Sequence, residues 1–431
     1  MKRILLAAIG SLGDIHPMIA IGLALQSRGH EIIFATSSYY HKRLEQFGFT
    51  VRTLRPDSIN PTDIDMLASL MDLRQGTCRL MRDYIFANIN DTYEDLLAFS
   101  ESVDAILVTE LVYAGRLVAD VRKIPWAFLA LSPGTFFSTH DMPVLPGAEG
   151  FSFLTKFGPS VNEGLIQLGK FSCASWPAPY HRLRNSLGLQ PQDNPIFAAK
   201  FSPHLVLAAF SSVLGRPQVD WPKSAVVTGF AYHDSVPDLF EKDKESNNER
   251  LAKFLAKGEA PIVFTLGSAA MFVPGDFYHE SLEAARRLNR RAIFLMGQNT
   301  LFEDLPQTML AVDYLPFQDI FPQAAAIVHQ GGVGTSAQAL RAGKPTLCVP
   351  FSHDQPDNAA RLERLGTSLS LSRQKYRAAA VAARLSTLLE GKANPHVVRA
   401  AAVAARMKNE TNDGDGADKA ADCILKMIDD G

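Results

Sequence analysis

A glycine-rich tract and a later acid–amide pair are the residues whose types and spacing point most directly to chemistry. The tract is His329-Gln330-Gly331-Gly332-Val333-Gly334-Thr335, it opens a stretch with a helical pattern, and Asp354-Gln355 follows further along. Glycines at the start of a helix let bare backbone N–H groups approach a phosphate. An aspartate beside a glutamine offers acceptors and donors suited to sugar hydroxyls. The two motifs together predict a pocket for a nucleotide-activated sugar.

A second motif stands near the start of the chain, where the apolar run Ile4–Ile9 leads into Gly10-Ser11-Leu12-Gly13-Asp14-Ile15-His16-Pro17. The run is too short for the core of a signal peptide and passes into a strand-to-loop pattern instead. No stretch of about 18 apolar residues occurs, so no transmembrane helix is predicted. We therefore expect a cytoplasmic protein, with peripheral membrane contact at most.

Composition excludes several classes of protein. The chain has 431 residues, 47% of them hydrophobic and 20% charged, which is ordinary for a globular protein with an ample core. A net charge of −2 gives no electrostatic reason to expect nucleic acid as a partner. The four cysteines include no CxxC pair, so neither a zinc site nor a disulfide framework is indicated. The length favours two domains.

Short apolar runs alternate with helical patterns along most of the chain, which predicts an α/β protein with parallel sheets built from βαβ units, in two Rossmann-like domains. The expected strands are Arg3–Ile9, Glu31–Thr36, Ala105–Thr109, Trp126–Leu131 and Leu205–Phe210 in the first half, and Ala225–Thr228, Ile262–Leu266, Ala292–Met296, Ala326–His329 and Pro345–Val349 in the second. The expected helices include Met18–Arg28, Ser281–Leu288, Thr335–Ala342, Ala359–Leu365 and Lys419–Met427.

Pro-rich and charged residues suggest where the two domains meet. We expect a first domain over 1–215, a linker and the start of the second domain over 216–258, and the remainder of the second domain over 259–411. A last helix, about 412–431, has the option of packing back on the first domain. The segments Asp57–Ser100 and Gly134–Ala198 look like insertions on the first domain, and such loops often carry ligand specificity.

Residues 329–355 resemble the donor signature of the UDP-glycosyltransferase superfamily with the GT-B fold. Residues 10–17 resemble the corresponding loop of its bacterial members, among them glycopeptide-antibiotic glycosyltransferases, sterol-glucosyltransferase-like proteins and rhamnosyltransferases. The resemblance implies two Rossmann-like domains facing each other across a cleft. It also implies a UDP- or dTDP-linked sugar as co-substrate, with no other cofactor and no metal.

Carried onto this sequence, the resemblance implies a set of donor-binding residues, and two of them depart from the family pattern. Gln330 stands where most members have a histidine that contacts the diphosphate, while His329, one residue earlier, is either a second candidate for that contact or a core histidine. Gln338 stands where an acidic residue often holds the ribose. The implied donor-binding residues are Ser268, Tyr314, Phe317, His329, Gln330, Gly332, Gly334, Thr335, Gln338, Asp354 and Gln355.

The resemblance implies a catalytic group on the acceptor side as well. Asp14 stands where many relatives have a catalytic histidine, and a buried carboxylate there would be a stronger base than one in water. Asp14 could instead cap a helix beginning near Pro17. His16 is a second candidate base. Glu110 follows an expected strand, at the position where relatives with a catalytic histidine have its acidic partner. Its alternatives are a hydrogen bond to the acceptor, a hydrogen bond to His16, or no catalytic role. Asp63 and Asp65 are expected in the first turn of a helix and not at a metal.

These expectations converge on an inverting, metal-independent glycosyltransferase that moves a sugar to a hydroxyl of a small acceptor. The aromatic residues of the insertions favour an apolar or aromatic acceptor such as a phenolic, sterol, macrolide or lipid, although they could equally form loop core. Two alternatives stay open: a nucleotide-sugar epimerase or hydrolase on the same fold, and a non-catalytic nucleotide-sugar-binding subunit. The aromatic residues concerned are Phe136, Phe137, Phe151, Phe153 and Trp176.

Overall fold

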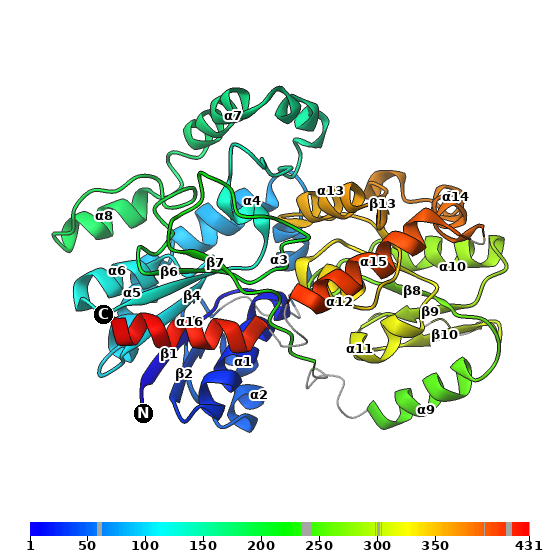
Figure 1. Cartoon of the computed structure of the whole chain (residues 1–431), viewed down its shortest axis with the longest axis horizontal. Coiled ribbons are helices and arrows are strands. Elements are labelled where there is room, and N and C mark those ends of the chain that lie inside the picture. Colours follow the sequence, from blue (N-terminus) through cyan, green and yellow to red (C-terminus); the bar gives the residue numbers. More distant parts are fainter. Residues whose placement is uncertain are drawn as a thin grey trace. The chain divides into compact units, whose positions relative to one another are not determined.

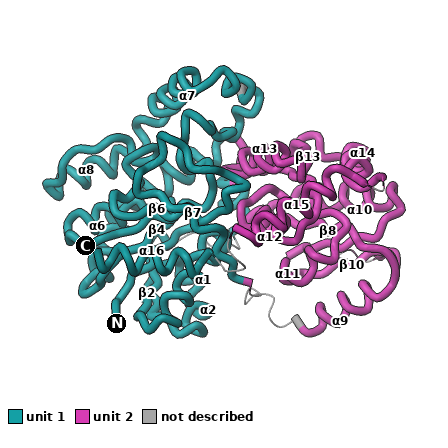
Figure 2. Tube along the Cα trace, viewed as in Figure 1, with its two compact units in different colours: residues 1–70, 74–233, 413–431 teal, residues 71–73, 234–412 magenta. Residues whose placement is uncertain are grey.

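The chain divides into two compact units (Figure 2). The computed structural model describes residues 1–57, 63–234, 244–297, 299, 302, 304–391, 393–410 and 416–430. The first unit comprises residues 1–70, 74–233 and 413–431, and the second comprises 71–73 and 234–412. The change from one unit to the other after residue 233 falls inside the stretch 216–258 that the sequence marks as a linker.

The first unit is built on a seven-stranded sheet with the order β3-β2-β1-β4-β5-β6-β7, in which all pairs are parallel (Figure 1). The central strands are apolar and almost completely buried because helices cover both faces of a parallel sheet. The strands are β1 (Arg3–Ala7), β2 (Glu31–Thr36), β3 (Thr50–Thr53), β4 (Ala105–Thr109), β5 (Trp126–Ala130), β6 (Leu205–Ala208) and β7 (Ala225–Val227).

Helices connect these strands, and both expected insertions are largely helical. The C-terminal helix α16 lies against α1 on this unit, where Ala420 and Ile424 join the core beneath the sheet (Figure 1). The helices are α1 (Leu12–Ser27), α2 (His41–Gln46), α3 (Ile64–Leu70), α4 (Gly76–Cys78), α5 (Ile89–Phe99), α6 (Ala114–Arg122), α7 (Pro159–Ser172), α8 (Ala178–Ser186) and α16 (Gly416–Asp430), with short π or 3-10 turns η1 (Ser38–Tyr40), η2 (Arg79–Phe86), η3 (Pro133–Phe136) and η4 (Glu149–Phe157).

The second unit contains a six-stranded parallel sheet with the order β10-β9-β8-β11-β12-β13. Its strands are β8 (Ile262–Thr265), β9 (Ala292–Leu295), β10 (Met309–Val312), β11 (Ala326–His329), β12 (Thr346–Cys348) and β13 (Ser368–Ser370). Its helices are α9 (Lys244–Leu255), α10 (Phe277–Arg287), α11 (Phe317–Ile320), α12 (Val333–Arg341), α13 (Gln355–Leu365), α14 (Ala378–Leu389) and α15 (Pro395–Glu410), with 3-10 turns η6 (Ala270–Phe272), η7 (Phe321–Gln323) and η8 (Arg373–Lys375).

Both sheets reverse their strand order at one point. In the first unit the order runs outward in opposite directions from the neighbouring pair β1 and β4, and in the second from β8 and β11. The loops that leave the carboxyl ends of such a pair turn to opposite faces of the sheet and leave a crevice, which is where open α/β sheets bind ligands. Topology alone therefore draws attention to the loops that follow β1, β4, β8 and β11.

The structure corrects several expected elements. Helix α1 begins at Leu12 instead of near Pro17, so Pro17 lies inside it. The expected strand Ala225–Thr228 belongs to the first sheet as β7 and not to the second domain. Strands β3, β10 and β13 were not expected from the sequence. Asp65 lies in the first turn of α3 as predicted, and Asp63 accepts a hydrogen bond there from the backbone N–H of Met66.

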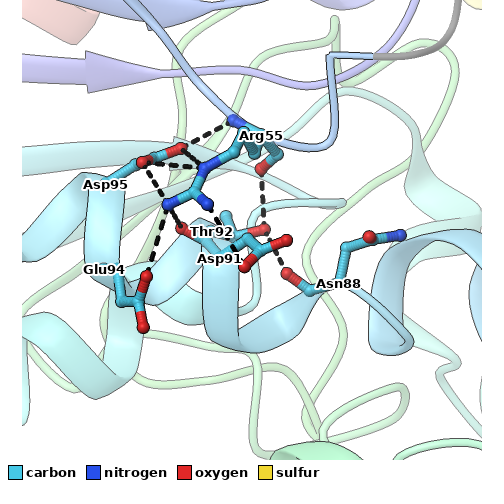
Figure 3. A network of polar contacts seen from close by, with 6 residues as sticks. All are labelled: Arg55, Asn88, Asp91, Thr92, Glu94 and Asp95. Carbon is cyan, nitrogen blue, oxygen red and sulfur yellow. Dashed lines mark hydrogen bonds and ion pairs between the residues drawn. The ribbon is translucent and has the colours of Figure 1, made fainter.

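An ion-pair network fixes the edge strand β3 to helix α5 (Figure 3). Arg55, just after β3, donates to both carboxylate oxygens of Asp95, with its guanidinium nitrogens 2.7–3.1 Å away. The backbone N–H of Arg55 donates to the same carboxylate at 2.9 Å, and the Thr92 hydroxyl donates to the Arg55 carbonyl at 2.8 Å. Glu94 lies at the rim of the network, 3.4 Å from Arg55. A strand with one open edge is thereby held by side chains as well as by its neighbour β2.

Candidate active site

The loop after β1 forms a capping box that orients Asp14. The backbone N–H of Ser11 donates to Asp14 Oδ2 at 2.9 Å, and the backbone N–H of Gly13 donates to Ser11 Oγ at 3.2 Å. Gly10 has a φ of +141°, and a Cβ atom placed on it would lie 2.2 Å from Asp14 Oδ2. Only glycine fits that position, because of both the backbone angle and the carboxylate beside it. Asp14 is thus the third residue of α1 and takes part in capping it. Its side chain stays partly exposed and lies just beyond the carboxyl end of β1.

His16 lies two residues further into α1, with His233 and Arg43 nearby. Its ring packs edge-on against that of His233, with centroids 5.3 Å apart. Its Nε2 atom is buried and has no hydrogen-bond partner among the described residues. Burial, followed by the influence of His233 and Arg43, lowers the pKa of His16 well below its usual value. The ring is therefore neutral at physiological pH.

Glu110 leaves the carboxyl end of β4, next to the β1 loop in the order of the sheet. It accepts hydrogen bonds from the Thr135 hydroxyl at 2.9 Å and from the ammonium of Lys200. The Lys200 side chain is only 1% exposed, and its ammonium lies 5.2 Å from the centre of the Phe137 ring. In the described part of the chain, Glu110 therefore makes an ion pair with Lys200 and not the hydrogen bond to His16 that was one of its alternatives. No local pattern in the sequence points to Lys200, because folding alone brings it to Glu110 across 90 residues.

The aromatic residues of the insertions serve different purposes. Phe136 stacks on Trp221 at a centroid distance of 3.8 Å and is buried, so it is part of the core. Phe137 and Trp176 pack into a smaller cluster around Ile166, Cys173 and Phe197. Phe153 is 54% exposed. The side chain of Phe151 lies outside the described residues. Phe136 is thereby removed from the residues expected to contact an acceptor.

In the second unit, the loops after β8 and β11 come together at the N-terminus of α12. Gly332 is the N-cap of that helix, and no side chain caps it, so the first-turn N–H groups are available for an anion. A Cβ atom placed on Gly267, whose φ is +64°, would lie 2.2 Å from Gln330 Nε2 and 3.1 Å from Thr335 Oγ1. This close approach brings the Gly267–Ser268 turn, Gln330 and Thr335 to one place. Gly334 is exposed, with open space where a side chain would be.

The side chain of Gln330 lies beside Gly267, and among the described residues no hydrogen bond holds it in place. It is 6% exposed, and its Oε1 atom is buried without a hydrogen-bond partner in the described ranges. A buried amide oxygen without a partner costs free energy. A ligand group that pairs with this amide would remove that cost.

His329 is buried in the core, which favours the second of the two alternatives that the sequence leaves open for it. The side chain is 0% exposed, its Nδ1 accepts from the backbone N–H of Gly331 at 3.1 Å, and its Nε2 lies 3.5 Å from Cys348 Sγ. Burial lowers the pKa of His329 to about 3, so the ring is neutral. Because both ring nitrogens are occupied inside the protein, neither is directed at a ligand. His329 instead shapes the start of the glycine tract.

The remaining residues expected around the nucleoside have mixed positions. Gln338 donates to Asp234, which also forms an ion pair with Arg341 at 2.9 Å, so its amide is already engaged. Tyr314 is partly exposed, 6.4 Å from the ring of Phe317. Phe317 stacks on the buried Phe321 at 4.5 Å, so one of its faces is covered by core. Of the two, Tyr314 is the better placed to stack on a base.

The turn before α13 brings Asp354 beside the glycine tract. Asp354 is the N-cap residue of α13, but its side chain makes no cap hydrogen bond; its Oδ2 accepts from Asn358 Nδ2 at 2.7 Å. The helix-cap alternative therefore does not explain this carboxylate. Gln355 is 6% exposed, and its Oε1 accepts from the backbone N–H groups of Phe351 and Ser352 at 2.8 and 3.2 Å. Its carbonyl oxygen thus holds its own loop, which leaves the amide nitrogen as its only group for a sugar.

Two family models and several known proteins match this chain. Residues 4–121 match the family model of the glycosyltransferase family 28 N-terminal domain, and residues 280–419 match that of the erythromycin biosynthesis protein CIII-like C-terminal domain. The chain is 30% identical to the O-mycaminosyltylonolide 6-deoxyallosyltransferase of Streptomyces fradiae, over 89% of each chain. It is 26% identical to the vancomycin aglycone glucosyltransferase of Amycolatopsis orientalis, over 99% of this chain and 98% of that protein.

A solved structure shares the fold. The glycosyltransferase VinC, crystallised in complex with DTDP, superposes with a TM-score of 0.66 at 19% identity, covering all of both chains. Across the described ranges, no helix is long and apolar enough to cross a bilayer. With two parallel α/β units, the matching family models and the 30% identical relative, the chain belongs to the GT-B glycosyltransferases of the UDP-glycosyltransferase superfamily, which use nucleotide sugars.

Proposed function

We propose that this protein is an inverting, metal-independent glycosyltransferase that moves a sugar from a UDP- or dTDP-linked donor to a hydroxyl of a small apolar acceptor. The observation that carries the donor side is the uncapped N-terminus of α12, with Gln330, Thr335 and the Gly267 turn beside it. In this proposal the diphosphate lies against the first-turn N–H groups and the Thr335 hydroxyl. The partial positive charge at the helix end stabilises the leaving diphosphate.

In the proposal, the transferred sugar and the nucleobase are each held by residues that flank this diphosphate site. Asp354 accepts hydrogen bonds from sugar hydroxyls, the amide nitrogen of Gln355 donates one, and Tyr314 stacks on uracil or thymine. The structure in complex with DTDP supports a thymidine nucleotide as one of the two donor classes to test.

On the acceptor side, Asp14 acts as the general base. It takes the proton from the acceptor hydroxyl while the oxygen attacks the anomeric carbon, and the bond from that carbon to the diphosphate breaks. Inversion follows from a single displacement. His16, neutral and buried, and Glu110, paired with Lys200, line the same carboxyl end of the sheet and support binding of the acceptor. The names of the relatives favour a macrolide- or aglycone-like acceptor with an apolar body.

The test begins by finding the donor and then removes the base. Thermal-shift screening of UDP- and dTDP-sugars identifies the donor without knowledge of the acceptor. With that donor, we expect Asp14→Asn to reduce transfer by about 10²- to 10⁴-fold, the usual contribution of a general base. The affinity for the nucleotide, measured by calorimetry, stays unchanged because the donor loops belong to the second unit.

A matched control separates catalysis from capping. Asp57 is a carboxylate of the same unit that also caps a turn, through the Ser37 hydroxyl at 2.7 Å and the Ser38 N–H at 2.8 Å. Asp57→Asn is therefore expected to lower stability without a comparable loss of transfer. Transfer by Asp14→Asn near the wild-type rate would remove the base from the proposal.

A further inference from the structure

Asn358 makes two hydrogen bonds that join the two donor-binding segments. It lies on α13 and is 0% exposed. Its Nδ2 donates to the backbone carbonyl of Gly331, in the glycine tract, at 3.0 Å, and to Asp354 Oδ2 at 2.7 Å. The amide nitrogen of Asn358 thus donates both of its hydrogens, one to the glycine tract and one to the carboxylate of Asp354 in the turn before α13.

The orientation of this amide follows from its partners. A carbonyl oxygen and a carboxylate oxygen are both acceptors, so only the nitrogen of the amide suits them. Its Oδ1 is left buried without a hydrogen-bond partner in the described part of the chain. An unpaired buried acceptor costs free energy that a smaller apolar residue would not incur. The two donated hydrogen bonds therefore matter more at this position than general packing.

A second contact holds the same two segments together. Gly331 has a φ of +87°, and a Cβ atom on it would lie 3.1 Å from the backbone oxygen of Gln355. That distance is tighter than ordinary contact, and the neighbouring atom belongs to the backbone, which does not move aside easily. The absence of a side chain at Gly331 therefore lets the tract pack directly on the first residue of α13.

We infer that Asn358 is a positioning residue that couples the diphosphate-binding tract to the sugar-facing carboxylate of Asp354. The inference rests on the proposed function. Without the bridge, the N–H groups of α12 still receive the diphosphate, but Asp354 loses the hydrogen bond that ties it to the glycine tract through Asn358. Asn358 therefore governs recognition and transfer of the sugar more than affinity for the bare nucleotide.

The chain offers a control with the same chemistry at another place. Asn394 is 6% exposed, and its Nδ2 donates to the backbone carbonyls of Thr387 and Glu390 at 2.8 and 2.9 Å, at the end of α14. Asn394→Ala removes these two hydrogen bonds and the one that its Oδ1 accepts from the His396 N–H at 2.9 Å, within the same unit and without touching either donor segment. It measures the effect of lost stability alone.

The experiment is a double-mutant cycle between Asn358→Ala and Asp354→Ala. Calorimetry with UDP or dTDP, whichever matches the donor, and kcat/KM with the sugar nucleotide are measured for each variant. We expect Asn358→Ala to lower kcat/KM by about 10- to 100-fold, as loss of a residue that orients a ligand-contacting group does, with nucleotide affinity within about threefold of wild type. In the Asp354→Ala background the same change is expected to cost less than about threefold, since the residue it positions is gone.

The outcomes distinguish a failure of the coupling by Asn358 from a failure of the proposed function. If Asp354→Ala retains wild-type kcat/KM, the proposed sugar contact is wrong and the inference falls with it. If Asp354→Ala is impaired while Asn358→Ala matches Asn394→Ala, or if the two losses multiply in the double variant, only the coupling is overturned. Should Asn358→Ala fail to fold, Asn358→Ser, whose single hydroxyl cannot donate to both acceptors, takes its place and is expected to give the same contrast between sugar nucleotide and bare nucleotide. Equal losses for both ligands would overturn the coupling.

Discussion

At the residue scale, burial decides which ionisable groups of the site carry charge. His329 and His16 both sit where protonation is unfavourable, and burial is the main cause of the lowered pKa of each. Both rings are therefore neutral at pH 7. In the proposed function, backbone N–H groups then supply the positive potential at the departing diphosphate, and Gln330, which cannot become cationic, stands where the resemblance implies a histidine.

The buried state of His329 predicts how stability depends on pH. The unfolded chain binds a proton at this residue below pH 6.5, whereas the folded protein does so only below about pH 3. The folded state therefore loses stability as pH falls from 6.5 toward 3, by about 1.4 kcal/mol per pH unit from this group. His329→Asn, which keeps an acceptor near the Gly331 N–H, is expected to show a shallower slope than wild type in urea unfolding between pH 6.5 and 4.5. Parallel slopes would mean that the ring is protonated in the folded protein.

The sequence identifies residues of the site when their chemistry is local. The glycine tract, Thr335 and Asp14 are recognisable because the helix-start and capping patterns that use them span only a few residues. Lys200 and Asp234 were missed because each meets its partner only after folding, across 90 residues for Lys200 with Glu110 and 104 for Asp234 with Gln338. His329 was ambiguous for the opposite reason: its neighbours in sequence suggest a ligand, and its burial is decided by β12 beside it.

At the element scale, the central strands could be predicted and the edges could not. The strands β1, β4, β8 and β11 are uniformly apolar because both of their faces are covered. The three strands that were missed, β3, β10 and β13, all lie at sheet edges, and β7, assigned to the wrong sheet, lies at the fourth. β3 and β13 are polar and half exposed, so no apolar run marks them. Their pairing is set by the strand beside them.

The edge strand β3 depends on side-chain contacts, which gives a prediction for the Arg55 network. Asp95 is 16% exposed in its side chain and holds Arg55 through both oxygens, so Asp95→Asn is expected to cost about 1–3 kcal/mol of unfolding free energy. Glu94 is 68% exposed and makes one contact at 3.4 Å, so Glu94→Gln is expected to cost less than about 0.5 kcal/mol. Urea unfolding measures both. Equal losses would show that exposure does not decide the value of these ion pairs.

At the scale of the whole molecule, the chain crosses between units more than once. The last helix, α16, returns to the first unit, where Ile424 is 1% exposed within a core that includes α1 and the central strands. Arg28, the C-cap residue of α1, forms ion pairs with Asp418 and Asp422 of α16 at 3.0 and 3.2 Å. The sequence is compatible with packing of α16 on the first unit but does not establish it, because an amphipathic pattern does not identify the surface against which a helix packs.

The distribution of tryptophan lets this return be tested in the intact chain. All three tryptophans, Trp126, Trp176 and Trp221, belong to the first unit, so their fluorescence reports the unfolding of that unit. Ile424→Ala removes a buried side chain from the core shared by α16 and α1. We expect it to lower the stability reported by fluorescence by about 2–5 kcal/mol, the range for such core truncations.

The matched control is Leu388→Ala, which truncates a 0% exposed side chain in the core of the second unit. The loss of stability in Leu388→Ala is expected to appear in the helix signal measured by circular dichroism. The midpoint measured by fluorescence is expected to change less, because no tryptophan lies in the second unit. The reverse pattern, with Ile424→Ala silent in fluorescence and Leu388→Ala strongly visible, would mean that α16 does not stabilise the first unit. A loss confined to Ile424→Ala would instead establish that the fold of the unit carrying Asp14 depends on residues synthesised after the whole donor-binding unit.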